Sequence, residues 1–310
     1  MQRGFNKVSA ACFLSAIALW LIVTCVFIGL RPEHGWMAFV LVALFFASAP
    51  TRRLVAALMP FLIFGISYDW MNLLPNYKVN EVDIENLYVL EKTLFGINGA
   101  HGVALTPNEF FSVHHSGIAD IFAGFFYLCW VPVPIAFGLW LYFSGRRTAY
   151  VHFALVFLLV NLLGFAVYYI HPAAPPWYVQ MNGFEFVENT PGNVAGLGRF
   201  DQLTGLGVFE ALYGRNSNVF AAMPSLHSAY MLVAFIYSVR ARCSVWLRVA
   251  FAVICAGIWA TAVYTSHHYV LDVLGGIGVT LLGFALFEYG LMRVEAVKNF
   301  VKKYVRYISA

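Results

Sequence analysis

Charged residues are scarce in this chain of 310 residues, and their scarcity excludes an ordinary soluble protein. They make up 11% of the sequence, whereas soluble domains carry about 25%. Hydrophobic residues make up 61%, so the composition predicts a membrane protein. The formal net charge of +4 is small, and we expect lipids rather than nucleic acid as partners.

Cysteine is also sparse, and its spacing excludes two kinds of site. The five cysteines each stand alone within or beside an apolar run, without a CxxC pair. This pattern gives neither a disulfide framework nor the spacing of metal ligands, and we interpret the cysteines as small buried hydrophobic residues. The cysteines therefore give no metal site, and we expect no cofactor.

Long apolar runs are abundant, and they set the fold class. We predict an all-α, polytopic transmembrane helical bundle with about eight spans. The runs lie at about residues 9–30, 36–49, 54–71, 118–143, 150–170, 219–239, 245–264 and 268–292. Pro132 and Pro134 should kink the fourth run. The second run is short for a span and could form a re-entrant hairpin with its neighbour.

Basic residues divide unequally between the two sides of this arrangement. With the N-terminus in the cytoplasm, cytoplasmic segments hold 14 of the 19 Lys and Arg residues, a clear positive-inside bias. The bias predicts an even number of spans with both termini cytoplasmic. The chain then divides into N-terminal spans with an extracytoplasmic interfacial segment (1–117), a catalytic helical core (118–292) and a basic cytoplasmic tail (293–310). We expect the tail to lie on the membrane surface.

Two long polar stretches, 72–117 and 179–218, fall on the extracytoplasmic side. In the first, 82–94 has the periodicity of an interfacial helix. Thr106-Pro-Asn-Glu109 is typical of a helix start, because Thr can cap a helix and Pro suits its first turn.

Two short segments place polar chemistry at the ends of predicted spans. They are Met223-Pro-Ser-Leu-His-Ser-Ala-Tyr230 and Thr265-Ser-His-His-Tyr-Val-Leu-Asp272. His268 and Asp272 are four residues apart, which puts them on one face of a helix. A carboxylate can hold a histidine in one tautomer and leave its other nitrogen free to attack an electrophile. His227 can supply the acid for the leaving group, so we predict that these three residues form an extracytoplasmic active site.

Other residues near these segments are candidates for substrate binding. Helix N-termini suit a phosphate, and the Ser225 hydroxyl could add a donor. Arg215 is the candidate phosphate-binding cation, with an ordinary loop charge as the alternative. His171 and His267 could line the site, or could lie at a helix end and at the membrane interface. The aromatic residues nearby, such as Trp177, Tyr178, Tyr264 and Tyr269, are more typical of an interfacial belt.

These motifs resemble those of the type 2 phosphatidic acid phosphatase superfamily. Pro-Ser-Leu-His227 and His268-x3-Asp272 are similar to its second and third motifs, and Ala174-Pro-Pro-Trp-Tyr178 resembles its inositol phosphorylceramide synthase branch. The resemblance covers roughly a third of the chain, from Tyr168 to Gly276. It implies a mechanism without metal, in which His268 forms a phosphohistidine, Asp272 orients it and His227 transfers the proton.

The departures from the phosphatase motifs concern positive charge. The first motif, Lys-x6-Arg-Pro, is absent, and Ala262 stands where that branch has an arginine six positions before the nucleophile. Leu226 replaces the glycine of Pro-Ser-Gly-His. A phosphomonoester dianion needs more positive charge than a phosphodiester monoanion, so this site favours a diester donor such as a phospholipid headgroup.

We predict an integral membrane phosphotransferase that acts on lipids at the extracytoplasmic face. The resemblance implies transfer of a phosphoinositol-type headgroup from a phospholipid to a lipid hydroxyl such as that of ceramide. A lipid phosphate phosphatase, with water as acceptor, is the alternative within the superfamily. A proton relay or transporter is the alternative from another class, but it would need ionisable groups through the depth of the membrane. The sequence does not define the oligomeric state.

Overall fold

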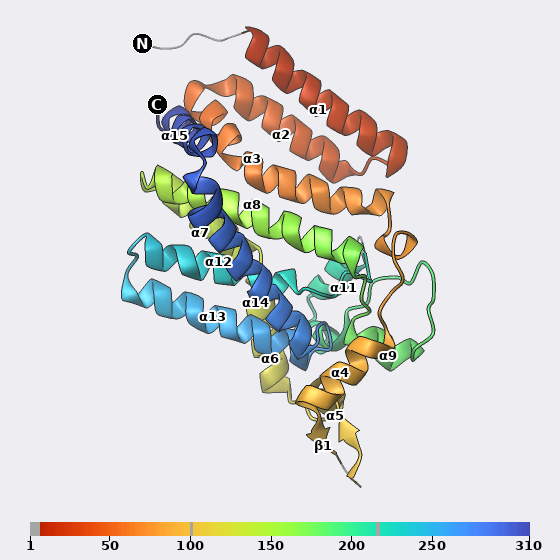
Figure 1. The fold of residues 1–310 in the computed structure, drawn as a ribbon. Helices are drawn as coiled ribbons and strands as arrows, with labels where there is room; N and C mark the ends of the chain where they lie inside the picture. Colours follow the sequence, from red (N-terminus) through yellow and green to blue (C-terminus); the bar gives the residue numbers. More distant parts are fainter. Residues whose placement is uncertain (1–6, 100–101, 215–217) are drawn as a thin grey trace.

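The computed structural model describes residues 7–99, 102–214 and 218–310, and it is a bundle of long helices that lie side by side (Figure 1). The N-terminal helices α1, α2 and α3 form one side of the bundle, and α8 connects them to the remaining long helices. The long helices are α1 (Lys7–Phe27), α2 (Pro32–Ala47), α3 (Ala49–Trp70), α6 (Gly117–Leu128), α7 (Pro132–Phe143), α8 (Arg147–Ile170), α12 (Leu226–Arg240), α13 (Val245–Tyr264) and α14 (Val270–Ala285).

Every predicted apolar run contains a helix, but the helices differ in their ability to cross a membrane. Among the described residues, five helical stretches are long and apolar enough: Lys7–Phe27, Ala49–Leu73, Arg147–Ile170, Val245–Tyr264 and Val270–Arg293. Helices α6 and α7 make a sixth if the two are one span bent by 41°. The break between α6 and α7 lies directly before Pro132, where the sequence predicted a kink. Helix α2 has 16 residues and α12 has 15, which is short for a span. The all-α membrane bundle is confirmed, whereas eight spans remain a prediction.

Helix α12 begins at Leu226, seven residues later than the start of the predicted run at 219. The residues before it form a turn at 219–220 and an isolated bridge at Ala221 instead. Ala173 lies between them and Asp83 in two parallel bridges, with Ala173 N donating to Phe220 O at 2.9 Å. Ser225 then caps the helix, because its Oγ accepts from the amide of Ser228 at 3.3 Å. This arrangement places His227 in the first turn of α12.

Glycines let neighbouring helices approach the start of α12 closely. A Cβ at Gly276 of α14 would lie 2.1 Å from the Ser225 carbonyl oxygen, and a Cβ at Gly164 of α8 would lie 2.6 Å from the Leu226 side chain. Lipid tails are as apolar as the helices, so close packing and interhelical hydrogen bonds hold such bundles together. One such bond joins α12 to α8, where the buried Tyr230 hydroxyl donates to Asn161 Oδ1 at 2.5 Å.

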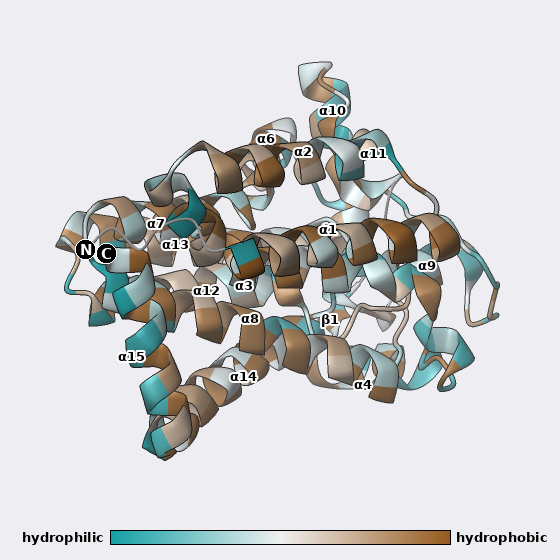
Figure 2. Cartoon of the chain, turned by 90° about the horizontal axis from the view of Figure 1, so that it is seen from above, coloured by the Kyte–Doolittle hydropathy of each residue, from teal (hydrophilic) through white to brown (hydrophobic). Residues whose placement is uncertain are grey.

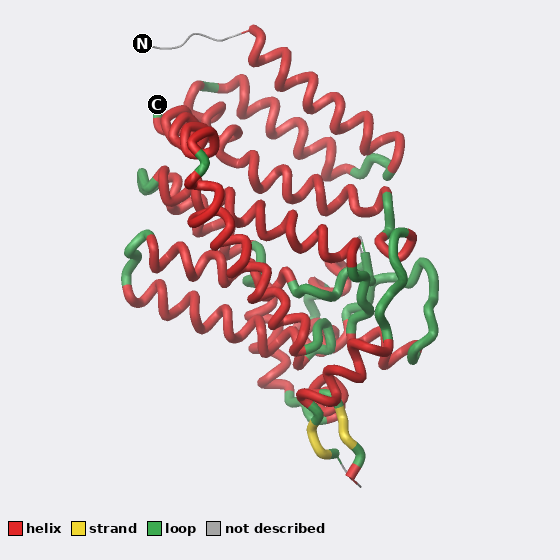
Figure 3. The backbone as a smooth tube through the Cα atoms, viewed as in Figure 1, coloured by secondary structure: helices red, strands yellow, loops and turns green. Residues whose placement is uncertain are grey.

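Short elements and loops gather at one end of the bundle (Figure 3). They are η1 (Met71–Leu73), η2 (Asn76–Lys78), α4 (Glu85–Phe95), β1 (Ile97–Asn98), β2 (Ala104–Leu105), α5 (Pro107–Val113), α9 (Pro176–Asn182), η4 (Ala195–Leu197), α10 (Gly198–Thr204) and α11 (Val208–Tyr213). The two strands pair antiparallel. The predicted helix start at Thr106 is confirmed, since its Oγ1 accepts from the amide of Glu109 at 3.2 Å. Most of these elements come from the two long polar stretches, and α9 begins three residues before the second.

The basic tail lies at the opposite end of the bundle. After η5 (Leu286–Gly290) and η6 (Leu291–Arg293), it forms α15 (Glu295–Ser309), whose hydrophilic residues contrast with the apolar bundle (Figure 2). Val301 and Ile308 are buried, and the Tyr304 hydroxyl donates to Ala56 O of α3 at 2.8 Å. The predicted amphipathic helix exists, but part of its apolar face packs on the bundle, so that part is not free to enter the membrane.

Candidate active site

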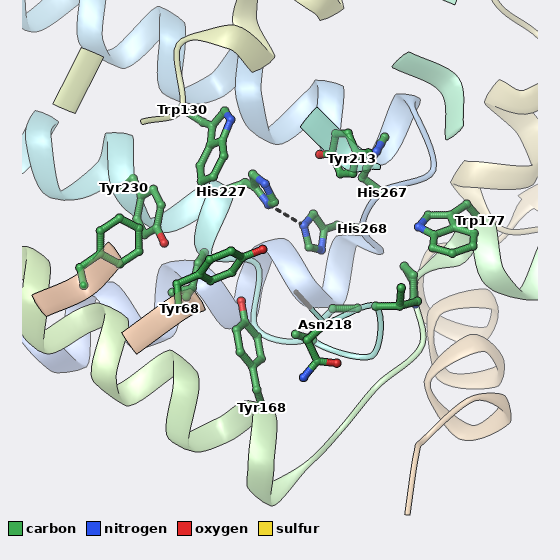
Figure 4. A pocket seen from close by; sticks show the side chains of 16 residues that line it. Tyr68, Trp130, Tyr168, Trp177, Tyr213, Asn218, His227, Tyr230, His267 and His268 are labelled. Atoms are coloured by element: carbon green, nitrogen blue, oxygen red, sulfur yellow. Dashed lines mark hydrogen bonds between the residues drawn. The ribbon is translucent and has the colours of Figure 1, made fainter. Parts of the chain in front are cut away.

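His227, His268 and Asp272 form a continuous line of side chains at the loop-rich end of the bundle. Nδ1 of His227 lies 3.0 Å from Nε2 of His268 (Figure 4). On its other side, Nδ1 of His268 lies 3.5 Å from Oδ2 of Asp272, the outer limit of a hydrogen bond. Asp272 is fully buried and His268 nearly so. The predicted trio therefore comes together in the order that a histidine nucleophile, its orienting carboxylate and a proton donor would need.

The backbone around Asp272 joins the two motifs. The Ser225 amide donates to the Asp272 carbonyl oxygen at 2.8 Å, which ties the start of α12 to the first turn of α14. The Asp272 carboxylate also accepts from the Tyr269 amide at 2.8 Å. His268 lies in the short connection between α13 and α14, two residues after Ser266, whose φ is 60°. The relative positions of the two histidines are thus set mainly by backbone hydrogen bonds.

A cavity with an empty volume of about 680 Å³, part of it open to solvent, adjoins the histidines. His227, His267 and His268 line one part of it, while aromatic and aliphatic side chains line most of the rest. The labelled aromatic residues in Figure 4 are Tyr68, Trp130, Tyr168, Trp177, Tyr213 and Tyr230. Among the described residues, no lysine or arginine lines this cavity. The site can therefore receive a molecule with a polar reacting group and an apolar body.

Aromatic rings restrict the motion of His227. Its ring lies 4.3 Å from that of Trp130 and 5.0 Å from that of Tyr127, measured between ring centroids.

Trp177, Tyr178 and Tyr269 are buried, so their assignment to an interfacial belt is wrong. Trp177 and Tyr178 of α9 pack in a buried cluster with Phe220, and Tyr269, directly before α14, packs in another with Leu87.

The predicted substrate-binding residues divide into three groups. His267 lines the cavity, next to His268. Ser225 is fully buried and uses its hydroxyl as a helix cap, and His171 pairs with Asp83 at 3.4 Å outside the cavity lining. Arg215 lies outside the described residues, so its predicted role stays a prediction.

Burial perturbs His267 strongly. Together with the neighbouring His268, burial lowers the pKa of His267 to about 3. Its Nδ1 lies 3.0 Å from Thr265 Oγ1, and its ring lies 4.5 Å from the ring of Tyr213. His267 is therefore a neutral imidazole near pH 7, suited to hydrogen bonding rather than to charge neutralisation.

The sequence did not identify several residues that shape the site. Tyr127, Trp130, Tyr168 and Tyr213 resembled ordinary residues of apolar or loop segments. Asn218 lines the cavity from a polar loop and carried no local signal. Among the described residues, no group of three or more His, Cys, Asp or Glu side chains is placed to hold a metal ion.

Comparisons with known proteins identify the family of the chain. The PAP2 superfamily matches residues 99–286. The chain is 59% identical over 293 residues to phosphoinositol dihydroceramide synthase of Bacteroides thetaiotaomicron, covering 94% of this chain and 96% of that protein. It is 30% identical over 219 residues to inositol phosphorylceramide synthase of Candida albicans, covering 67% of this chain and 42% of that protein. It is 25% identical over 239 residues to the inositol phosphorylceramide synthase catalytic subunit of Saccharomyces cerevisiae, covering 74% of this chain and 55% of that protein. No solved structure gives a significant match.

The chain therefore belongs to the PAP2 superfamily. Within it, the chain falls in the inositol phosphorylceramide synthase-like branch, and it is an integral membrane enzyme of the phosphotransferase class. The resemblance that the motifs predicted is confirmed.

Proposed function

We propose that this enzyme moves a phosphoinositol-type headgroup from a phospholipid to the hydroxyl of a ceramide or a similar lipid. The observation that carries the proposal is the line from His227 through His268 to Asp272 beside a largely aromatic cavity. The named activity of the Bacteroides relative, at 59% identity, supports the same donor and acceptor classes. The missing Lys-x6-Arg-Pro motif and Ala262 at the usual arginine position favour a phosphodiester monoanion over a phosphomonoester.

In the first half-reaction, Nε2 of His268 attacks the phosphorus of the donor lipid. A nitrogen–phosphorus bond forms and the bond from phosphorus to the glycerol oxygen breaks. His227 gives its proton to that oxygen, so diacylglycerol leaves as a neutral alcohol. Asp272 stabilises the proton on Nδ1 of His268 and keeps the ring in the tautomer that presents Nε2.

In the second half-reaction, the acceptor hydroxyl attacks the phosphohistidine. His227 takes the proton from the hydroxyl as the oxygen–phosphorus bond forms, and the nitrogen–phosphorus bond breaks. Both histidines then return to their starting states. A phosphoryl group held between the two rings would replace their direct contact of 3.0 Å.

We also infer that the site faces away from the cytoplasm, with eight membrane-crossing segments and both termini inside. Arg52 and Arg147 lie in the first turns of α3 and α8, and Arg240 ends α12, at the end of the bundle opposite the site. The positive-inside rule assigns that end to the cytoplasm. The test of this orientation replaces the five native cysteines with alanine, because Cys12 and Cys25 are exposed rather than buried as expected, and then introduces single cysteines at Lys78 and Lys303. An impermeant maleimide should label only the first in intact cells, and the reverse result would overturn the orientation.

The catalytic proposal is tested by incubating the purified enzyme in detergent with labelled phosphatidylinositol and ceramide. The wild type should form a labelled phosphoinositol-lipid, and His268→Ala should lower that rate at least about a thousandfold. His114→Ala is the matched control, because His114 is an exposed histidine outside the cavity.

The products separate the alternatives. Release of headgroup phosphate or free phosphate, still dependent on His268, would mean that water is the acceptor and that the enzyme is a lipid phosphatase. Full transfer activity in His268→Ala would overturn the assignment of the nucleophile.

A further inference from the structure

A buried carboxylate from the loop-rich end of the bundle binds the backbone that follows His268. Glu91 of α4 accepts from the Val270 amide through Oε1 at 2.9 Å and from the Leu271 amide through Oε2 at 3.1 Å. Glu91 is fully buried. These are the first two amides of α14, which have no partner within the helix. The carboxylate therefore caps the helix that carries Asp272, whose first residue, Val270, lies 179 residues from Glu91 along the chain.

A second buried side chain holds the backbone at His268 itself. Asn108 of α5 donates through Nδ2 to the His268 carbonyl oxygen at 2.9 Å and to the Val263 carbonyl oxygen at 2.8 Å. Asn108 is also fully buried. The two side chains thus hold the turn from both sides, Asn108 through its carbonyl oxygens and Glu91 through its amides.

Helices α4 and α5 are connected to each other. The Tyr88 hydroxyl donates to Glu109 Oε1 at 2.7 Å, and Lys92 donates to the Tyr88 hydroxyl at 2.9 Å. Tyr88, three residues before Glu91, and Glu109, next to Asn108, therefore join the two helices. Movement of one helix would be transmitted to the other and to the His268 turn.

Burying an ionised carboxylate costs free energy unless the carboxylate is paired and hydrogen-bonded. Burial raises the pKa of Glu91, although the two amide hydrogen bonds oppose this change. The positive end of the α14 dipole also favours a carboxylate at this position. Because Glu91 occupies the first two amides of α14, these amides are not available to bind a substrate phosphate, as a free helix N-terminus would.

We propose that Glu91 and Asn108 are positioning residues that hold His268 in line with His227 and the reacting phosphorus. This inference rests on the proposed function, in which His268 is the nucleophile. Its physical basis is that a displacement of about 1 Å at a reacting group can cost about a hundredfold in rate. Neither side chain lines the cavity, so each acts through the backbone of the turn.

Steady-state transfer by Glu91→Gln in detergent, with phosphatidylinositol and ceramide, tests the inference. The amide has the same shape but only one acceptor oxygen, and its NH2 group opposes a backbone N–H. We expect kcat to fall about 10- to 100-fold while KM changes less than about twofold. Glu91→Asp keeps both oxygens and should recover part of the loss. Glu85→Gln, the same change at an exposed position of α4, should behave as wild type.

Asn108→Ala provides an independent arm if Glu91→Gln does not fold, and it should show the same loss of kcat. Wild-type kcat in either folded variant would overturn the inference. So would a loss of kcat that only parallels a fall in the apparent melting temperature, because that result indicates general destabilisation. His268→Ala is measured beside them: activity in that variant refutes the proposed nucleophile, whereas an inactive His268→Ala with a fully active Glu91→Gln refutes the positioning role alone.

Discussion

The bundle carries a histidine–carboxylate cluster at each end, and the two clusters differ in how completely their hydrogen bonds are satisfied. At the end opposite the site, Glu288 accepts from Tyr237 at 2.5 Å and from Arg240 at 2.9 Å, and it lies 2.9 Å from His152 Nδ1. Both of its oxygens are used. Such a saturated network stabilises a packed structure and leaves little capacity for a substrate.

The cluster at the site is less saturated. Among the described residues, Asp272 Oδ1, His268 Nδ1 and His267 Nε2 are buried and form no hydrogen bond of normal geometry. Buried polar atoms rarely stay in that state without a functional reason, and catalytic hydrogen bonds often shorten only when substrate binds. The comparison indicates that Asp272, which has an oxygen without a hydrogen bond, is a better candidate for catalysis than the saturated Glu288.

The largest effect expected from this comparison is on Asp272→Asn. The amide cannot stabilise the proton on His268 Nδ1 as a carboxylate does, and it favours the wrong tautomer. We expect kcat to fall on the order of 10³- to 10⁴-fold, as for other histidines oriented by a carboxylate. The apparent melting temperature should change little, because the carboxylate is incompletely hydrogen-bonded in the folded protein. Initial rates and thermal unfolding in detergent, measured on one preparation, check the fall in kcat and the unchanged melting temperature. A rate within tenfold of wild type would refute the orienting role.

The same substitution at the other end should have the opposite profile. Glu288→Gln loses a charged acceptor for three partners, and hydrogen bonds to charged groups contribute about 1.5–3 kcal/mol each. Arg240 is partly exposed, so its ion pair contributes less. We expect a net destabilisation of about 1–3 kcal/mol, seen as a fall of a few degrees in apparent melting temperature, with kcat within about twofold. A large loss of kcat at unchanged stability would mean that the two clusters do not differ in the way described.

The sequence predicts these two regions to different extents. The trio at the site was predictable because His268 and Asp272 are four residues apart and His227 belongs to a recognisable motif. The helical bundle was predictable because apolar runs of spanning length have few other solutions in a membrane.

The contacts that support the trio were not predictable. Glu91 meets Leu271 across 180 residues, and Asn108 meets His268 across 160. In the sequence both were ordinary residues of interfacial segments. The start of α12 was misplaced because residues 220–222 hydrogen-bond to Ala173, a tertiary contact without a local pattern. Local spacing therefore predicts the candidate reacting groups, whereas the residues that we propose to position them are brought together only by the folded backbone.

The smallest effect expected is on the pH dependence of stability, through His267. Its ring binds a proton near pH 6.5 in an unfolded chain but only near pH 3 in the folded protein. The stability that this difference provides is complete above pH 6.5 and is lost progressively as the pH falls toward 3. One such group changes stability by at most about 1.4 kcal/mol per pH unit, so His267→Asn should make the acid-induced fall in melting temperature shallower by a few degrees between pH 7 and 5. Thermal unfolding in detergent across this range measures the slope, with His114→Asn at an exposed position as the control. An unchanged slope in His267→Asn would mean that this ring already takes up a proton in the folded enzyme, and that the site tolerates positive charge beside His268.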